Sequence, residues 1–233
     1  MARQSQAPAS DTDDAQDDDE HPEQQGRLSL HIAAGGRADE RLQRSSVPRQ
    51  TAEMPPDPRP VESVINDLID NPVRTEDVRT RAPSAPGLYA WWAPPAIVPD
   101  LVGVPHPTVP DQRLLYIGLA TKLRSRLASN HLRRTGSSTL RRTLAGLLLD
   151  EQGYRTRWTD RVVLVDDDEA RLTEWMGNNL RVSWCEYPTP GEVEGDIIRA
   201  LRPPLNLDHA SGPSTQVVKT ARRRYHDSAG PRP

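Results

Sequence analysis

Several features that decide the class of a protein are scarce in this 233-residue sequence. It has a single cysteine, Cys185, which excludes an internal disulfide and any cysteine-rich zinc module. No apolar run reaches the length that spans a membrane, and the first ten residues lack the apolar segment of a signal peptide. We therefore expect a cytoplasmic protein without a membrane partner.

Hydrophobic residues are also scarce, at 35% of the chain, which is low for a chain that folds throughout. Residues 11–23 hold eight acidic residues and no lysine or arginine, and four prolines stand between positions 54 and 60. Such composition cannot bury enough apolar surface to form a core. We expect a disordered acidic and proline-rich tail over 1–59, a folded domain over 60–226 and a disordered C-terminus over 227–233.

The formal net charge of −3 hides an uneven distribution. The first 60 residues carry 12 acidic and 7 basic residues, which leaves 21 acidic and 23 basic residues of the chain's 33 and 30. Residues 112–149 contain no acidic residue and eight basic ones: Arg113, Lys122, Arg124, Arg126, Arg133, Arg134, Arg141 and Arg142. A solvated helix face usually mixes both signs, so this stretch favours a phosphate-binding surface.

The hydrophobic pattern predicts a small α/β domain of the α+β kind, in which helices flank a central β-sheet. Strands are predicted over 87–92, 114–119, 161–166 and 180–187. Helices are predicted over 121–132, 137–151, 166–179, 189–201 and 216–227. A loop with six prolines joins the first two strands.

One carboxylate in the helix predicted over 189–201 stands at an unusual position. Glu194 shares a helix face with the apolar residues Ile197, Ile198 and Leu201. A buried carboxylate needs a cation, which could be an arginine or a metal ion. Alternatively, Glu194 lies at the exposed rim of the stripe, and this helix alone does not decide between the two.

Two short motifs, Gly-Leu-Tyr at 87–89 and Tyr-Ile-Gly at 116–118, resemble the paired motifs that name the GIY-YIG nuclease superfamily. Arg126 follows Gly118 by eight residues, where the family places its helix arginine. Residues 194–206 resemble the family's closing signature of Glu, an apolar pair, Pro and Asn. The resemblance covers 86–206, and it is most like a bacterial group with a Ser-Thr-Leu-Arg-Arg helix, here 138–142.

The resemblance implies a metal-dependent endonuclease with DNA as the expected substrate. Glu194 would hold one divalent ion, Mg²⁺ or Mn²⁺, and Arg126 would bind the phosphate. Tyr89 is the preferred general base and Tyr116 would orient the water, with nearby cations lowering the tyrosine pKa. Asn206 would hold the site together or contact phosphate.

Further substrate contacts are expected from a glycine and from the basic stretch. Gly118 would let the backbone turn close to the phosphate. Leu119 stands where many family members have a lysine, so Lys122 or Arg124 would supply that charge. The other basic residues expected to face phosphate are Arg133, Arg134, Arg141 and Arg142.

The family histidine that follows the helix arginine by one turn is displaced in this sequence. Asn130 stands at its place, and His131 is one residue further along. If the α-helix continues, His131 points towards Leu127 and not towards Arg126. We still count His131 among the candidate site residues.

Two other functions remain open at this point. The chain could be a non-catalytic nucleic-acid-binding module on the same fold, or an interaction protein whose acidic tail recruits a partner. The intact set of site residues favours the nuclease over the binding module. No recognisable zinc finger or additional DNA-binding domain indicates how a target would be selected.

Overall fold

The computed structural model describes residues 59–207 and 213–233. All of them belong to the unit Pro55–Pro233. Apart from Arg59, the tail predicted over 1–59 lies outside the described residues, so its disorder stays a prediction.

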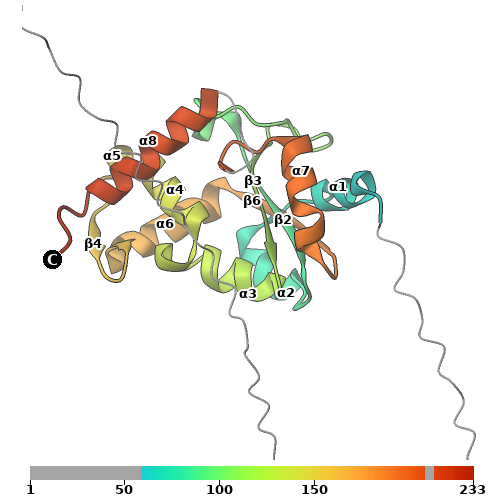
Figure 1. The fold of residues 1–233 in the computed structure, drawn as a ribbon, viewed down its shortest axis with the longest axis horizontal. Helices are drawn as coiled ribbons and strands as arrows, with labels where there is room; N and C mark the ends of the chain where they lie inside the picture. The colour runs from blue at the N-terminus through green and yellow to red at the C-terminus, as the bar shows by residue number, and fades with distance from the viewer. Residues whose placement is uncertain (1–58, 208–212) are drawn as a thin grey trace, which may run out of the picture. The chain divides into compact units, whose positions relative to one another are not determined.

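A four-stranded antiparallel sheet lies at the centre of the domain (Figure 1). In spatial order its strands are β1 (Val73–Arg74), β6 (Arg181–Glu186), β2 (Gly87–Ala93) and β3 (Arg113–Ala120). Every residue of β2 is buried, because this strand has neighbours on both sides. β3 is an edge strand, and one side of its backbone is therefore open to other partners. The strands predicted over 87–92, 114–119 and 180–187 are confirmed.

Helices cover both faces of this sheet, as Figure 1 shows. The principal ones are α1 (Val61–Ile69), α4 (Thr139–Leu147), α6 (Asp166–Asn179) and α7 (Glu194–Leu201). Leu88 and Ala90 belong to the core that includes buried residues of α1 and α7. Tyr89 and Trp91 point to the opposite face and join the core with α4 and α6. This division follows from the two-residue period of side chains along a strand.

Several predicted helices form with breaks or shifted ends. The helix expected over 121–132 is a short α3 (Leu123–Ser125) followed by the π-helix η3 (Arg126–His131). The helix expected over 137–151 breaks at Leu148, and its second part is α5 (Leu149–Gln152). The remaining short helical elements before α7 are α2 (Val78–Arg81) and the 3-10 helices η1 (Thr75–Asp77), η2 (Pro95–Ile97), η4 (Thr135–Ser137) and η5 (Pro190–Glu192).

A second, two-stranded sheet pairs β4 (Thr156–Trp158) with β5 (Val162–Leu164). The last helix, α8 (Pro213–Asp227), lies against α4 (Figure 1). The residues after it contact β4, where Trp158 Nε1 donates to Gly230 O at 2.8 Å and Arg232 lies over the Trp158 ring. These contacts come from the segment expected to be a disordered C-terminus over 227–233, and its disorder stays a prediction.

None of the helices in the described part of the chain is both long and apolar enough to cross a membrane.

Candidate active site

Two tyrosines from neighbouring strands stand side by side on one face of the sheet. Tyr89 on β2 and Tyr116 on β3 have ring centroids 6.3 Å apart. Tyr116 pairs with Trp91, and the register between the strands shifts between Trp91 and Trp92. Such bulges are common beside active sites, where they re-aim side chains.

Gly118 provides the space that the Tyr89 phenol occupies. A Cβ atom on Gly118 would lie 2.5 Å from the Tyr89 hydroxyl oxygen and 3.0 Å from Tyr116 Cε1. Gly118 pairs with Tyr89 within β3 and does not have a positive φ. The backbone does not turn at Gly118, because this residue lies within β3. A contact of Gly118 with phosphate stays a prediction. Only a residue without a side chain fits against the two tyrosines.

The π-helix η3 brings an arginine and a histidine to the same phenol. Its hydrogen bonds join residues five apart, as between Leu132 N and Leu127 O at 3.2 Å. Arg126 and His131 therefore lie on one face, with Arg126 Nε 3.4 Å and His131 Nε2 2.7 Å from the Tyr89 hydroxyl oxygen. The expectation that His131 points towards Leu127 assumed an α-helix and is wrong.

His131 is enclosed by protein and has no exposed surface. Its Nδ1 lies 2.7 Å from Ser138 Oγ, which also accepts the backbone N–H of Arg141 and so caps α4. Burial, helped by the positive charges of Arg126 and Arg141, holds the pKa of His131 well below its usual value. The imidazole is therefore neutral.

The half-buried Tyr116 has the electrostatics of a tyrosine that keeps its proton. Burial raises the pKa of its hydroxyl, and the charges of Tyr89 and Glu194 raise it further. Arg126 and Arg222 act in the opposite direction, but burial outweighs them. Nearby cations were expected to lower the tyrosine pKa, and for Tyr116 the net effect is the reverse.

Glu194 is the first residue of α7, and its side chain is half-buried. Ile197 and Ile198 on the same helix are buried, as the apolar stripe predicts. Glu194 lies close enough to Tyr116 for its negative charge to raise the pKa of that hydroxyl. Thr189 and Glu192 do not form a capping box with the backbone. Instead, Thr189 Oγ1 donates to Glu192 Oε2 at 2.8 Å, and the α-helix begins only at Glu194.

Asn206 holds the free edge of β3. Its Oδ1 accepts the N–H of Ile117 at 2.9 Å, and its Nδ2 donates to the C=O of Ile117 at 2.8 Å. Leu205 N donates to Leu115 O at 3.0 Å, so the same segment bonds on both sides of Tyr116. Asn206 was expected to hold the site together or to contact phosphate. Its amide is used to pair the edge strand, which is the first of these two roles.

Comparison with known proteins agrees with this geometry. The model of the GIY-YIG catalytic domain family matches residues 87–224. The chain belongs to the GIY-YIG family. No curated protein and no solved structure matches it. Membership indicates a nuclease-type function, directed at nucleic acid, and the matched region runs beyond the closing asparagine into α8.

An arginine of α8 adds to this GIY-YIG site and was missed from the sequence. Arg222 Nε donates to Thr143 Oγ1 at 3.0 Å, and its NH2 donates to Leu205 O at 3.3 Å. Its charge acts on Tyr116. The three consecutive arginines of the predicted last helix were the available signal, but nothing in the sequence placed that helix against α4.

The basic stretch over 112–149 divides between the surface and the interior of the GIY-YIG domain. Its exposed members are Lys122, Arg124, Arg133 and Arg134. Arg141 has no exposed surface, and its guanidinium pairs with Glu169 at 2.8 Å. The half-buried Arg142 donates to the backbone carbonyl of Thr135 at 3.1 Å. The expectation that Arg141 faces phosphate is therefore wrong, because this arginine lies in the core.

A metal site built from several ligands is absent from the described residues, which contain no group of three His, Cys, Asp or Glu side chains able to hold an ion. Mg²⁺ keeps several water ligands and often binds through one or two carboxylates together with substrate phosphates. The half-buried Glu194 beside Tyr116 fits such a weakly held ion. The donor chemistry of the site is therefore compatible with the divalent ion of GIY-YIG enzymes.

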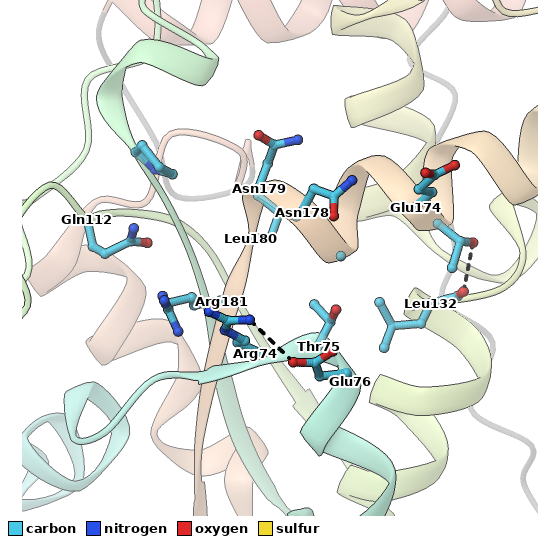
Figure 2. A pocket seen from close by; sticks show the side chains of 13 residues that line it. Arg74, Thr75, Glu76, Gln112, Leu132, Glu174, Asn178, Asn179, Leu180 and Arg181 are labelled. Atoms are coloured by element: carbon cyan, nitrogen blue, oxygen red, sulfur yellow. Dashed lines mark hydrogen bonds and ion pairs between the residues drawn. The ribbon is translucent and has the colours of Figure 1, made fainter.

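A cavity of about 580 Å³ lies elsewhere in the domain, between α6 and the ends of β1 and β6 (Figure 2). Two arginines, Arg74 and Arg181, and two glutamates, Glu76 and Glu174, are among its lining residues. Arg74 and Glu76 pair with each other at 3.5 Å. None of the candidate catalytic side chains lines this cavity. Its balanced charges select no class of ligand.

Proposed function

We propose that the chain is a metal-dependent endonuclease that hydrolyses phosphodiester bonds in DNA, with Tyr89 as the general base. The observation that carries this proposal is the meeting of Arg126 Nε and His131 Nε2 at the Tyr89 hydroxyl oxygen. Donors and positive charge at a phenol oxygen favour its ionised form. Burial raises the pKa of the neighbouring Tyr116, which suits that tyrosine to keep its proton rather than to act as the base.

In this mechanism Tyr89 accepts a proton, whereas Tyr116 keeps its own. Tyr89 as a phenolate takes a proton from a water molecule, whose oxygen attacks phosphorus. The bond between phosphorus and the 3′ oxygen breaks, and that oxygen leaves with the electron pair and takes a proton from solvent. Tyr116 keeps its proton and donates a hydrogen bond that orients the water or a phosphate oxygen. Arg126 supplies positive charge to the phosphate.

Glu194 is the residue proposed to hold one divalent ion, Mg²⁺ or Mn²⁺. When bound, such an ion polarises a phosphoryl oxygen and stabilises charge on the leaving oxygen. The carboxylate lies at the start of α7, half-buried and close enough to Tyr116 to raise its pKa. Asn206, which bonds to Ile117, keeps the edge strand and its tyrosine in place.

The surface around α3 and η3 is proposed to bind the nucleic-acid backbone. Lys122, Arg124, Arg133 and Arg134 are exposed there, before and after the segment that carries Arg126. Arg142 is only half-buried and remains a candidate, whereas the buried Arg141 does not. Contacts with phosphate release counterions, so binding should weaken steeply with salt.

A plasmid-nicking assay tests the proposal. Supercoiled DNA is incubated with the full-length chain in Mg²⁺, in Mn²⁺ and in EDTA, beside a labelled RNA of similar length. We expect nicking of DNA with either ion and none in EDTA. DNA binding without cleavage under all conditions would instead favour the non-catalytic module, and cleavage restricted to RNA would correct the substrate.

A further inference from the structure

The hydroxyl of Ser138 has two partners and a single proton to share. It accepts the backbone N–H of Arg141 at 3.1 Å, and it lies 2.7 Å from His131 Nδ1. Ser138 has no exposed surface. A backbone N–H can only donate, so the proton of Ser138 must point to a different atom. His131 Nδ1 is the acceptor that the described residues place within reach.

This arrangement fixes the position of the proton on the imidazole. The neutral ring of His131 carries one N–H and one acceptor nitrogen. If Nδ1 accepts from Ser138, the N–H is on Nε2, which lies 2.7 Å from the Tyr89 hydroxyl oxygen. His131 is then a hydrogen-bond donor to Tyr89 and cannot take its proton through Nε2.

The reverse arrangement leaves a buried group unpaired. With the proton on Nδ1, Ser138 Oγ would accept from both His131 and Arg141. Its own hydroxyl proton would then have no acceptor among the described residues, at a position closed to water. A buried donor without an acceptor is strongly disfavoured and rarely observed.

We propose that Ser138 is a positioning residue, which holds His131 in the Nε2–H tautomer so that it donates to the oxygen of Tyr89. Arg126 Nε is a second donor to that oxygen, at 3.4 Å. Two N–H donors stabilise the phenolate that Tyr89 forms as a base. The inference rests on the proposed function, in which Tyr89 is a phenolate, because a neutral Tyr89 would itself have a proton for which His131 Nε2 lies 2.7 Å away as an acceptor.

Nitrogen-15 NMR of the full-length chain reads the tautomer without reference to activity. In a neutral imidazole the protonated nitrogen and the acceptor nitrogen give well-separated signals. The chain has six histidines, and the signals of His131 are those that His131→Gln removes. We expect the Nε2–H form of His131 at neutral pH. The Nδ1–H form would overturn the inference, even in an active enzyme.

Two substitutions of Ser138 test its role in catalysis. Ser138→Ala removes the hydroxyl, so we expect signals of both tautomers and a roughly tenfold fall in kcat with KM unchanged. Ser138→Thr keeps a hydroxyl and should restore the Nε2–H signal and most of the lost kcat. A Ser138→Ala variant with wild-type kcat and an unchanged tautomer would end the inference but leave the proposed function standing.

Because Ser138 also caps α4, a stability control is needed. Leu147 is the last residue of the same helix, and Leu147→Ala removes apolar packing there. It leaves the hydrogen-bonded side chains of Ser138, His131 and Tyr89 unchanged. Below its melting transition it should keep the Nε2–H signal and wild-type kcat. If wild-type protein cleaves no substrate, the proposed function fails, and the NMR result still decides the tautomer.

Discussion

Replacing Arg141 with methionine removes a cation from the interior of the helical layer. The guanidinium donates to Glu169 Oε2 at 2.8 Å, Glu169 O at 2.9 Å, Thr173 Oγ1 at 3.1 Å and His131 O at 3.2 Å. Breaking a buried ion pair from one side is unfavourable by about 3–5 kcal/mol, since the partner charge is stranded. For a domain of this size, that lowers Tm by about 6–20 °C.

Thermal melts and salt-dependent DNA binding together test this assignment. Arg141→Met should melt earlier than wild type but, where folded, bind DNA with an unchanged salt dependence. The exposed neighbour Arg133 is the matched control, because Arg133→Met should keep its Tm and weaken binding. Our reasoning is refuted if Arg141→Met keeps the wild-type Tm and loses DNA affinity, since that pattern belongs to a surface residue.

Three further outcomes are expected. The pKa of His131 lies well below its ordinary value, so below pH 6.5 the unfolded chain binds more protons than the folded chain and stability falls on acidification. His131→Gln should therefore lose stability less steeply than wild type between pH 7.5 and 5 in chemical denaturation. Gly118→Ala should displace the Tyr89 phenol and stop cleavage. Circular dichroism should show that this variant is folded, and the nicking assay should show that it no longer cleaves DNA. Charge reversal at Arg133 and Arg134 should raise the Kd for DNA and reduce its salt slope without changing Tm, and an unchanged slope would remove these two residues from the binding surface.

The elements that could be read from the sequence are those whose local signals agree. α6 spans Asp166–Asn179 as predicted, since an acidic first turn and a terminal asparagine mark its ends. β2 and β3 were identified from their aromatic and apolar residues. The placement of Tyr89 beside Tyr116 followed from the family motifs rather than from strand patterns.

The remaining features depend on contacts between distant residues. The π-turn of η3 has no sequence signal, and the resulting shift of His131 towards Tyr89 therefore could not be foreseen. Arg141 lies within a run of bases, but Glu169, which makes its burial possible, is 28 residues away. Arg222 is brought to the site by the packing of α8 on α4. A charge run in a sequence does not reveal which of its members are buried.

Single-turnover cleavage by Tyr89→Phe is the most direct test of the proposed mechanism. This substitution removes only the oxygen that Arg126 and His131 approach. With Mg²⁺, and with DNA binding and Tm near wild type, we predict a fall in the cleavage rate of about 10²–10⁴-fold. Tyr187→Phe, which removes a hydroxyl from the core on the opposite face of the sheet, should cleave like wild type. Wild-type cleavage by Tyr89→Phe would contradict the assignment of Tyr89 as the base.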